Sequence, residues 1–310
     1  MMTRAPWDAQ SVQIGGRQVA SVAEWVEGAR LRTLPAAISP VFAGTGIAAF
    51  VGGADPLRAV LAGFVALALQ VGVNYANDYS DGVRGTDEHR VGPQRLVGSG
   101  AAQPRTVKRA ALACFGLAAI LGLVLVGLSG QWWLLAVGLA CILAAWYYTG
   151  GEHPYGYRGL GEVFVFIFFG LVATAGTTYV QLGSVPWPTW AAATTMGALS
   201  CAVLVCNNLR DIPSDRLSGK RTLETMLGDR YSRWFYVLLV VIAVAAVVLT
   251  AAGTTWWALL GLSALVFLVP ATRHIITGGT GFALVRTLKL TGFAELAAGI
   301  GLFVGCLIGV

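Results

Sequence analysis

Apolar residues occur along this chain in long uninterrupted blocks, with the polar residues confined between them. Five stretches contain no Asp, Glu, Lys or Arg, and they cover residues 33–54, 59–77, 110–151, 163–209 and 234–272. A helix needs about 20 apolar residues to cross a bilayer. The first two stretches match one span each. The last three are about twice as long, and each has a turn-like break in its middle, at residues 130–133, 183–188 and 253–257.

With a final apolar run near the C-terminus, this pattern predicts an all-α membrane protein with nine spans. The predicted spans are residues 34–52, 58–79, 107–128, 132–149, 162–182, 188–208, 233–252, 256–272 and 290–309. The composition supports this class, since 56% of the 310 residues are hydrophobic and 12% are charged, against roughly 25% charged in soluble domains. It argues against an ordinary soluble enzyme and against a disordered chain.

The basic residues predict the orientation in the membrane. All of the 21 Lys and Arg residues except Arg58 fall in or at the edges of five segments, which are residues 1–32, 78–109, 150–161, 210–233 and 273–289. Cytoplasmic loops carry such an excess. We therefore expect a protein of the inner cell membrane with a cytoplasmic N-terminus, an external C-terminus and a cytoplasmic active face. The net charge of +6 reflects this topology and does not indicate nucleic-acid binding.

A weak internal repeat suggests the domain organisation. The second and sixth spans both end in Asn and Asp residues four apart, at Asn77 and Asp81 and at Asn207 and Asp211. We expect a cytoplasmic tail over residues 1–29 and a single transmembrane domain over 30–310. That domain would contain two four-helix halves, at about 30–150 and 151–272, and a ninth helix.

Both repeated ends open into polar stretches that are rich in acid. Their acidic residues are Asp78, Asp81, Asp87, Asp211 and Asp215. Clustered carboxylates repel each other and are costly to desolvate near lipid, and Mg²⁺ relieves both costs while it also binds phosphate oxygens. The basic residues nearby are Arg90, Lys220 and Arg221. The stretches therefore predict a metal–diphosphate site. The alternative is that these Asp residues are solvated caps and turn formers, and the presence of two matching stretches disfavours it.

Residues Asn207, Asp211 and Asp215 are spaced four apart, which would place them on one face of a helix. We expect Pro213 to kink or end that helix. A third inner segment, residues 146–162, combines aromatic side chains, glycines and Arg158. It could form a lid over an aromatic substrate, or an interfacial aromatic belt followed by a glycine-rich turn.

The two acidic stretches together resemble the paired aspartate motifs of the UbiA superfamily of intramembrane aromatic prenyltransferases. The similarity is greatest to its 1,4-dihydroxy-2-naphthoate polyprenyltransferase (MenA) branch. It rests on residues 32–36, 77–79, 85–87, 91–93, 148–151, 154–157, 207–211 and 219–223 and extends from about residue 30 through the ninth span. His89 departs from the pattern, since relatives usually have an acidic residue there. Glu152 and His153 also depart, where relatives often have Pro and an apolar residue.

The resemblance implies a helical bundle around a central cavity that opens laterally to lipid, with Mg²⁺ and a long-chain polyprenyl diphosphate as ligands. It implies transfer of the polyprenyl group to 1,4-dihydroxy-2-naphthoate, with loss of carbon dioxide and a proton, to give demethylmenaquinone. The expected metal ligands are Asn77, Asp81, Asp87, Asn207, Asp211 and Asp215. The expected substrate-binding residues are Arg90, Lys220, Arg221, Tyr155 and Asn208. The expected catalytic residues, which position the acceptor or move a proton, are Asp78, Tyr148 and Arg158.

Two alternatives stay open at this point. Another acceptor of the same superfamily, 4-hydroxybenzoate, homogentisate or haem, would use the same metal site. A secondary transporter also has repeated halves, but it normally places polar groups at mid-membrane, whereas the acidic groups here lie at one edge. The sequence leaves the prenyl chain length and the oligomeric state open.

Overall fold

The computed structural model describes residues 12–14, 17–85 and 95–310, and these are helical apart from one short hairpin. The hairpin pairs β1 (Val12–Ile14) with β2 (Arg17–Val19) in antiparallel register. Outside it, the all-α class is confirmed. The helices up to the middle of the chain are α1 (Val22–Gly28), η1 (Leu31–Thr33), α2 (Pro35–Phe50), α3 (Pro56–Arg84), α4 (Pro104–Ser129) and α5 (Leu134–Tyr147).

The second part of the chain repeats this pattern of long antiparallel helices. Its elements are η2 (Tyr155–Tyr157), α6 (Gly161–Val165), η3 (Phe166–Val172), α7 (Ala173–Leu182), α8 (Pro188–Leu217), α9 (Leu223–Gly253), η4 (Trp256–Ala264), α10 (Leu265–Ile276) and α11 (Phe282–Ile308). The segments α6, η3 and α7 form one continuous rod in which η3 is a π-helix, and η4 is a 3₁₀-helix that continues into α10.

Seven helices among the described residues are long and apolar enough to cross a membrane, and an eighth is added if the bent pair Val22–Thr33 and Pro35–Phe50 is one span. The remaining apolar helix, α5, has 14 residues and would extend about 21 Å, less than the roughly 30 Å of a hydrocarbon core. Length and composition therefore support a multi-pass membrane protein and do not confirm the count of nine.

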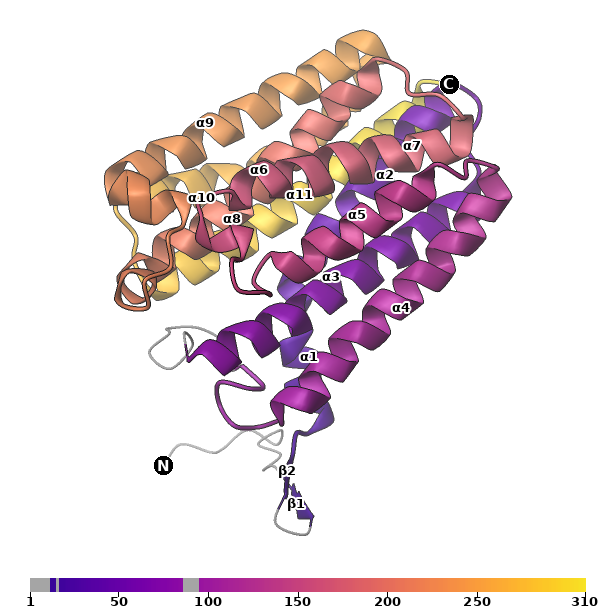
Figure 1. Ribbon diagram of the computed structural model, residues 1–310. Helices are drawn as coiled ribbons and strands as arrows, with labels where there is room; N and C mark the ends of the chain where they lie inside the picture. Colours follow the sequence, from indigo (N-terminus) through magenta and orange to yellow (C-terminus); the bar gives the residue numbers. More distant parts are fainter. Residues whose placement is uncertain (1–11, 15–16, 86–94) are drawn as a thin grey trace, which may run out of the picture.

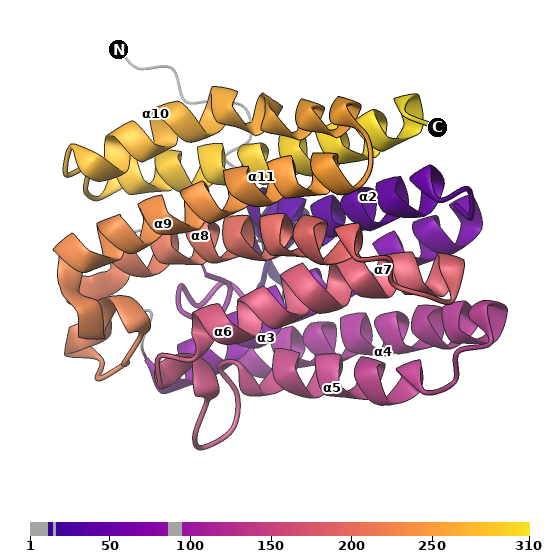
Figure 2. The same ribbon diagram turned by 90° about the horizontal axis from the view of Figure 1, so that it is seen from above.

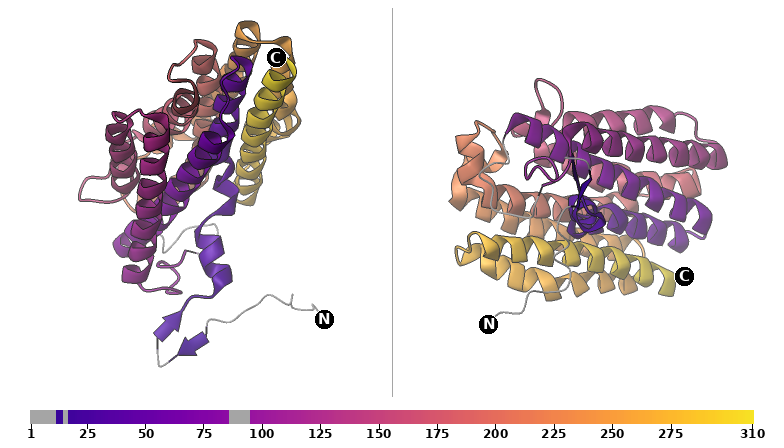
Figure 3. Two further views of the ribbon diagram at one scale, coloured as in Figure 1. Left: turned by 90° about the vertical axis from the view of Figure 1, so that its right-hand side faces the viewer. Right: turned by 90° about the horizontal axis from the view of Figure 1, so that it is seen from below.

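The helices run side by side in one bundle (Figure 1). Helices α9 and α10 lie on one side, α4 and α5 on the other, and α2, α7 and α8 between them (Figure 2). The most extensive contacts join α8 with α9, α3 with α4, and α11 with both α2 and η4. The hairpin and α1 project from the end of the bundle opposite the C-terminal end of α11 (Figure 3). The middle layer therefore brings together segments from distant parts of the sequence.

Small residues allow α2 and α11 to pack with their backbones in close approach. A Cβ atom on Gly299 would lie 2.6 Å from the Ser39 carbonyl oxygen, and one on Gly46 would lie 2.7 Å from the Phe303 Cα. Lipid tails supply no hydrophobic drive between helices, so such close contacts are a main source of stability in a membrane bundle. This packing fixes α2, one wall of the interior cavity described next.

Candidate functional site

A cavity of about 410 Å³ lies inside the bundle. The lining of the cavity changes from apolar to polar along helix α3, which contributes Ala62, Ala66 and Leu69 at one end and Asn77 and Asp81 at the other. These residues span about 28 Å along the helix axis. The other residues at the apolar end include Leu125, Leu134, Val137 and Val180. The cavity is thus apolar over most of its length and strongly polar at one end.

The end of α3 places Asn77 and Asp81 in the polar end of the cavity. The helix starts with Pro56 after the N-cap Asp55, whose side chain accepts from the Arg58 N–H. It ends at Gly85, where φ is 73°, a left-handed conformation that glycine adopts without steric cost. Asn77 and Asp81 are one turn apart, so both side chains lie on the cavity face.

Helix α8 supplies the second acidic face. Asn207, Asp211 and Asp215 all line the cavity, as their spacing of four predicts. Of the two expectations for Pro213, a kink or an end of the helix, the second is wrong, because α8 continues to Leu217. Proline removes only its own N–H bond to the carbonyl four residues earlier, and the packed neighbours of α8 hold the remaining turns in place.

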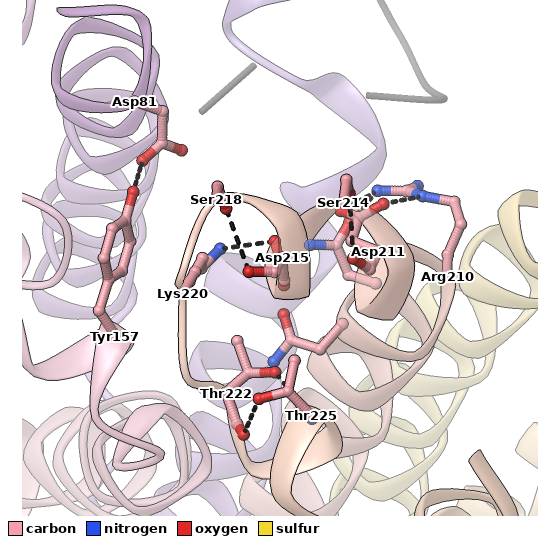
Figure 4. A network of polar contacts seen from close by, with 12 residues as sticks. Asp81, Tyr157, Arg210, Asp211, Ser214, Asp215, Ser218, Lys220, Thr222 and Thr225 are labelled. Atoms are coloured by element: carbon pink, nitrogen blue, oxygen red, sulfur yellow. Dashed lines mark hydrogen bonds and ion pairs between the residues drawn. The ribbon is translucent and has the colours of Figure 1, made fainter. Parts of the chain in front are cut away.

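Each acidic side chain at this end is already paired within the protein (Figure 4). The Arg210 guanidinium donates to both oxygens of Asp211, at 2.7 and 2.8 Å, and to Asn207 Oδ1 at 2.8 Å. Lys220 Nζ lies 3.8 Å from Asp215 Oδ1. These contacts compensate the buried charges, which would otherwise be costly so close to lipid.

Asp81 is paired differently, with residues from outside its own helix. The Tyr157 hydroxyl donates to Asp81 Oδ1 at 2.6 Å, and Arg95 Nη2 lies 3.8 Å from Asp81 Oδ2. The neighbouring ligand candidate Asn77 accepts from the Thr149 hydroxyl at 2.8 Å. Tyr157 and Thr149 both belong to the segment between α5 and α6, so this segment closes the polar end of the cavity.

Asp78 does not line the cavity. Its side chain is fully buried, and its two oxygens accept from the backbone N–H groups of Leu96 and Val97 at 2.8 and 2.9 Å. A carboxylate that satisfies two buried amides anchors the loop between α3 and α4. This geometry favours an anchoring role over the expected role in proton transfer.

An aromatic wall lies beside the acidic groups. Tyr155 stacks on Phe164 with ring centroids 4.0 Å apart and contacts Tyr148 edge-on at 5.5 Å, and all three line the cavity. Burial raises the pKa of the Tyr155 phenol, so it stays protonated and donates to the Ala144 carbonyl oxygen at 2.8 Å. The wall therefore presents a flat apolar surface on which the Tyr155 hydroxyl stays protonated.

Asn208 lies next to this wall and is held from behind. Its Nδ2 donates to Glu162 Oε1 at 3.1 Å, and both side chains are buried. Glu162 in turn lies against Glu224, so two carboxyl groups share a site that is shielded from water. The hydrogen bond fixes which way the Asn208 amide points at the cavity.

Two more of the expected site residues, Arg158 and Arg221, lie away from the cavity. Arg158 and Arg221 pair through their backbones, but both residues are exposed and neither lines the cavity. Asp87 and Arg90 lie outside the described residues.

Two cavity residues that the sequence reasoning did not select are Arg30 and Arg32, in the segment before α2. Arg30 has φ of 55°, which turns the chain between α1 and η1. Asn74 of α3 holds this turn by donating to the Ala29 carbonyl at 2.8 Å and to the Thr33 hydroxyl at 3.0 Å. Two arginines directly before an apolar span are a usable signal, but topology alone also explains them.

Two further residues missed were Arg95 and Tyr157. Arg95 lines the polar end of the cavity, and Tyr157 reaches that end by its hydrogen bond to Asp81, which Arg95 also approaches. Nothing in their spacing separates them from surface residues, since only the folded loops bring them to the cavity.

The described residues contain no preformed group of three or more His, Cys, Asp or Glu side chains that could hold a metal ion. The donor set nevertheless suits a hard cation, since carboxylate and amide oxygens from two helices face one small polar volume. Mg²⁺ uses one or two carboxylates and takes its other ligands from water and phosphate, so it does not need a complete protein cage.

The fold and the cavity define a class, a multi-helical membrane protein with an amphipathic interior and acidic groups on two facing helices. The model of the UbiA prenyltransferase family matches residues 37–304, and the chain belongs to this family. The 1,4-dihydroxy-2-naphthoate octaprenyltransferase of Mycobacterium tuberculosis is 53% identical over 278 residues, which cover 90% of this chain and 94% of the relative. The predicted family is thus confirmed.

Two solved structures share the fold. A UbiA homolog from Aeropyrum pernix, determined in its apo form, superposes with a TM-score of 0.68 at 16% identity and covers 88% of this chain and 97% of its own. A UbiA homolog from Archaeoglobus fulgidus, determined with GPP and Mg²⁺, superposes with a TM-score of 0.66 at 13% identity and covers 91% and 99%. At these identities the likeness shows the fold alone.

Proposed function

We propose that this chain transfers a polyprenyl group from polyprenyl diphosphate to 1,4-dihydroxy-2-naphthoate, with decarboxylation, to give demethylmenaquinone for menaquinone biosynthesis. The observation that carries the proposal is the convergence of two acidic helix faces at the polar end of an otherwise apolar cavity. The 53% identity to a 1,4-dihydroxy-2-naphthoate octaprenyltransferase supports this choice of acceptor.

The polar end would hold Mg²⁺ and the diphosphate. We assign the metal-facing oxygens to the residues of α3 and α8, which are Asn77, Asp81, Asn207, Asp211 and Asp215, with Asp87 as a further candidate. Mg²⁺ would supply a positive charge that stabilises the diphosphate as it leaves. The basic residues that line this end, Arg30, Arg32, Arg95 and Lys220, would neutralise the remaining phosphate charge, and Arg90 and Arg221 are further candidates.

The apolar part of the cavity would hold the first isoprene units of the donor, with the rest of the chain extending into lipid. Leu69, Leu125, Leu134 and Phe168 line this part. When the carbon–oxygen bond of the donor breaks, the allylic carbon becomes electron-poor and reacts readily with water. A wall of aliphatic and aromatic side chains excludes water, so the carbon survives until the acceptor attacks it.

The acceptor would bind against the aromatic wall, between the diphosphate and Asn208. The stacked pair of Tyr155 and Phe164 offers a flat surface for a naphthalene ring. The Asn208 amide, oriented by Glu162, and the Tyr148 hydroxyl are within the same wall and supply polar contacts for the acceptor's oxygens. Arg158 stays a candidate for positioning the acceptor or moving a proton, with a side chain that is exposed here.

We also propose the membrane arrangement that the charge pattern predicts. Nine spans, with α5 as the shortest, place the N-terminus in the cytoplasm and the C-terminus outside the cell membrane. The polar end of the cavity then faces the cytoplasm, where a water-soluble aromatic acid is available. The spans form two four-helix halves, which contribute α3 and α8 to the site, and α11 packs against α2 and α8.

The test is a substrate panel with the purified protein and one polyprenyl diphosphate. Separate reactions contain 1,4-dihydroxy-2-naphthoate, 4-hydroxybenzoate or homogentisate with Mg²⁺, and a further reaction contains haem. Products are identified by mass spectrometry. We expect demethylmenaquinone in the first reaction. Product in only one of the other reactions would mean that its aromatic compound or haem, and not 1,4-dihydroxy-2-naphthoate, is the acceptor. No product in any of the four reactions would refute prenyl transfer.

A further inference from the structure

Tyr157 contacts side chains of both acidic stretches, Asp81 and Arg84 in the first and Lys220 in the second. It belongs to η2, in the segment between α5 and α6, and comes from neither of the two acidic helices. Its hydroxyl donates to Asp81 Oδ1 at 2.6 Å, a short bond of the kind that a carboxylate forms with a phenol (Figure 4). Half-buried beside the cavity, it is directed at a candidate metal ligand of α3.

The ring of Tyr157 makes the contact to the other stretch. Lys220 Nζ lies 5.2 Å from the ring centroid, and Arg84 Cζ lies 5.4 Å from it. Both distances are in the range of cation–π attraction. Lys220 also lies 3.8 Å from Asp215 Oδ1, and its backbone N–H donates to the Asp215 carbonyl at 2.9 Å. A continuous chain of contacts therefore runs from Asp81 through Tyr157 and Lys220 to Asp215.

The backbone around Tyr157 is fixed from both sides. Arg84 donates to the carbonyl oxygens of Thr149 and Gly151, which ties the segment to the end of α3. The Gly156 N–H donates to the Tyr148 carbonyl at 3.0 Å, and a Cβ on Gly156 would lie 2.6 Å from that oxygen. On the other side, the backbone pairing of Arg158 with Arg221 ties the segment to the turn before α9.

We propose that Tyr157 is a positioning residue of the metal–diphosphate site, one that sets the orientation of the Asp81 carboxylate and keeps Lys220 beside Asp215. Two carboxylates on separate helices repel each other, so their approach needs groups that hold them. A hydrogen bond to a ligating carboxylate orients it, and the loss of such a partner typically weakens metal binding by about 10- to 100-fold. This proposal rests on the proposed function, because it assumes that Asp81 faces a metal ion.

The decisive variant is Tyr157→Phe, which keeps the ring between the two cations and removes only the hydroxyl. The full-length protein, purified in detergent, is titrated with Mn²⁺ in the presence of inorganic pyrophosphate, and free Mn²⁺ is measured by electron paramagnetic resonance. We expect the dissociation constant for Mn²⁺ to rise about tenfold while the thermal inactivation temperature stays unchanged. A dissociation constant within twofold of the unsubstituted protein overturns the proposal.

The matched control is Tyr179→Phe. The Tyr179 hydroxyl also donates to a side chain, Gln131 Oε1, at 2.8 Å, but α7 carries it to the end of the bundle opposite the acidic groups. The control loses a comparable hydrogen bond, and we expect its Mn²⁺ affinity to be within twofold of the unsubstituted protein. An equal loss in both variants would mean that the effect is general destabilisation, which also overturns the proposal.

A second variant, Tyr157→Leu, removes the ring as well. Because Lys220 then loses its aromatic contact, we expect the KM for polyprenyl diphosphate to rise about threefold above that of Tyr157→Phe. Equal KM values in the two variants would refute the link to Lys220. Failure of the proposed function would give a different result. The protein would then bind Mn²⁺, with an affinity that Tyr157→Phe lowers, but the unsubstituted protein would transfer no prenyl group to any acceptor.

Discussion

The two acidic stretches look alike in sequence but are held in place in different ways. In α8, the cations that pair with the acids come from the same helix and the turn that follows it, since Arg210 binds Asp211 and Lys220 approaches Asp215. In α3, the acids contact other segments, with Asp78 bound to the loop at Leu96 and Val97.

Asp81 shows the same dependence on distant segments, through Tyr157 and Arg95. The α8 acids therefore have basic partners within their own stretch of chain, whereas the contacts described for the α3 acids come from two other segments. Two similar sequence motifs can therefore be held in place by different kinds of contact. Substitutions in the two stretches should separate chemistry from scaffolding, and the predictions below run from the largest expected effect to the smallest.

The largest effect should come from removal of the metal, which both stretches are proposed to share. Protein treated with EDTA and then freed of chelator should show only background transfer, because without a metal ion between them the buried carboxylates repel the diphosphate. Added Mg²⁺ should restore the activity, measured as prenylated product. Full turnover without any added divalent ion would contradict the proposal that the two stretches share a metal ion.

Asp81→Asn and Asp211→Asn should each lower turnover by about 100-fold or more, because each removes one proposed charged metal ligand from one of the two stretches. Circular dichroism and size-exclusion chromatography in detergent should match those of the unsubstituted protein. Near-normal turnover in either variant would contradict the shared metal site, and a large loss in only one of them would assign the metal to a single stretch.

Asp78→Asn provides the contrast within α3, three residues from Asp81. The amide oxygen can accept from one of the two backbone N–H groups, so the other loses its partner at a cost of about 1–3 kcal/mol. We expect a lower thermal inactivation temperature, with kcat per folded molecule within about threefold of normal. Loss of kcat at unchanged thermal stability would restore the original expectation that Asp78 acts in catalysis.

Glu295→Gln should have the smallest effect. Glu295 is a fully buried acid of α11 outside both stretches, and Ser200 of α8 donates to its Oε1 at 2.5 Å. Glutamine keeps that acceptor and introduces no charge, so turnover should stay within about twofold and stability within about 1 kcal/mol. A loss of turnover as large as that of Asp81→Asn would show that turnover depends on buried acidic residues outside the two stretches as well.

The sequence predicted the helical segments well because a long charge-free run has few alternatives in lipid, where each backbone polar group must be paired within the helix. It also predicted which faces of α3 and α8 line the cavity, since a spacing of four residues defines a face. The end of α8 was placed too early, because proline is a strong helix breaker on average and only packing shows where it is tolerated.

The roles of individual polar residues were less predictable. Asp78 and Asp81 are three residues apart, and the sequence does not reveal that one binds a loop while the other faces the cavity. Arg158 and Arg221 are exposed, whereas Arg30 and Arg32, which look like ordinary charges at a membrane boundary, line the cavity. A long side chain near a helix end can turn either way, and its neighbours decide.

What the sequence alone determined is therefore the membrane class, the course of the helices, the family and the pair of acidic faces, because each depends on local periodicity or on a compact motif. The tertiary structure decided which polar groups meet. Tyr157 and Asp81 are separated by 76 positions and lie 2.6 Å apart. The physical reason is that such a contact depends on the joint packing of several helices and loops, and no local pattern along the chain encodes that arrangement.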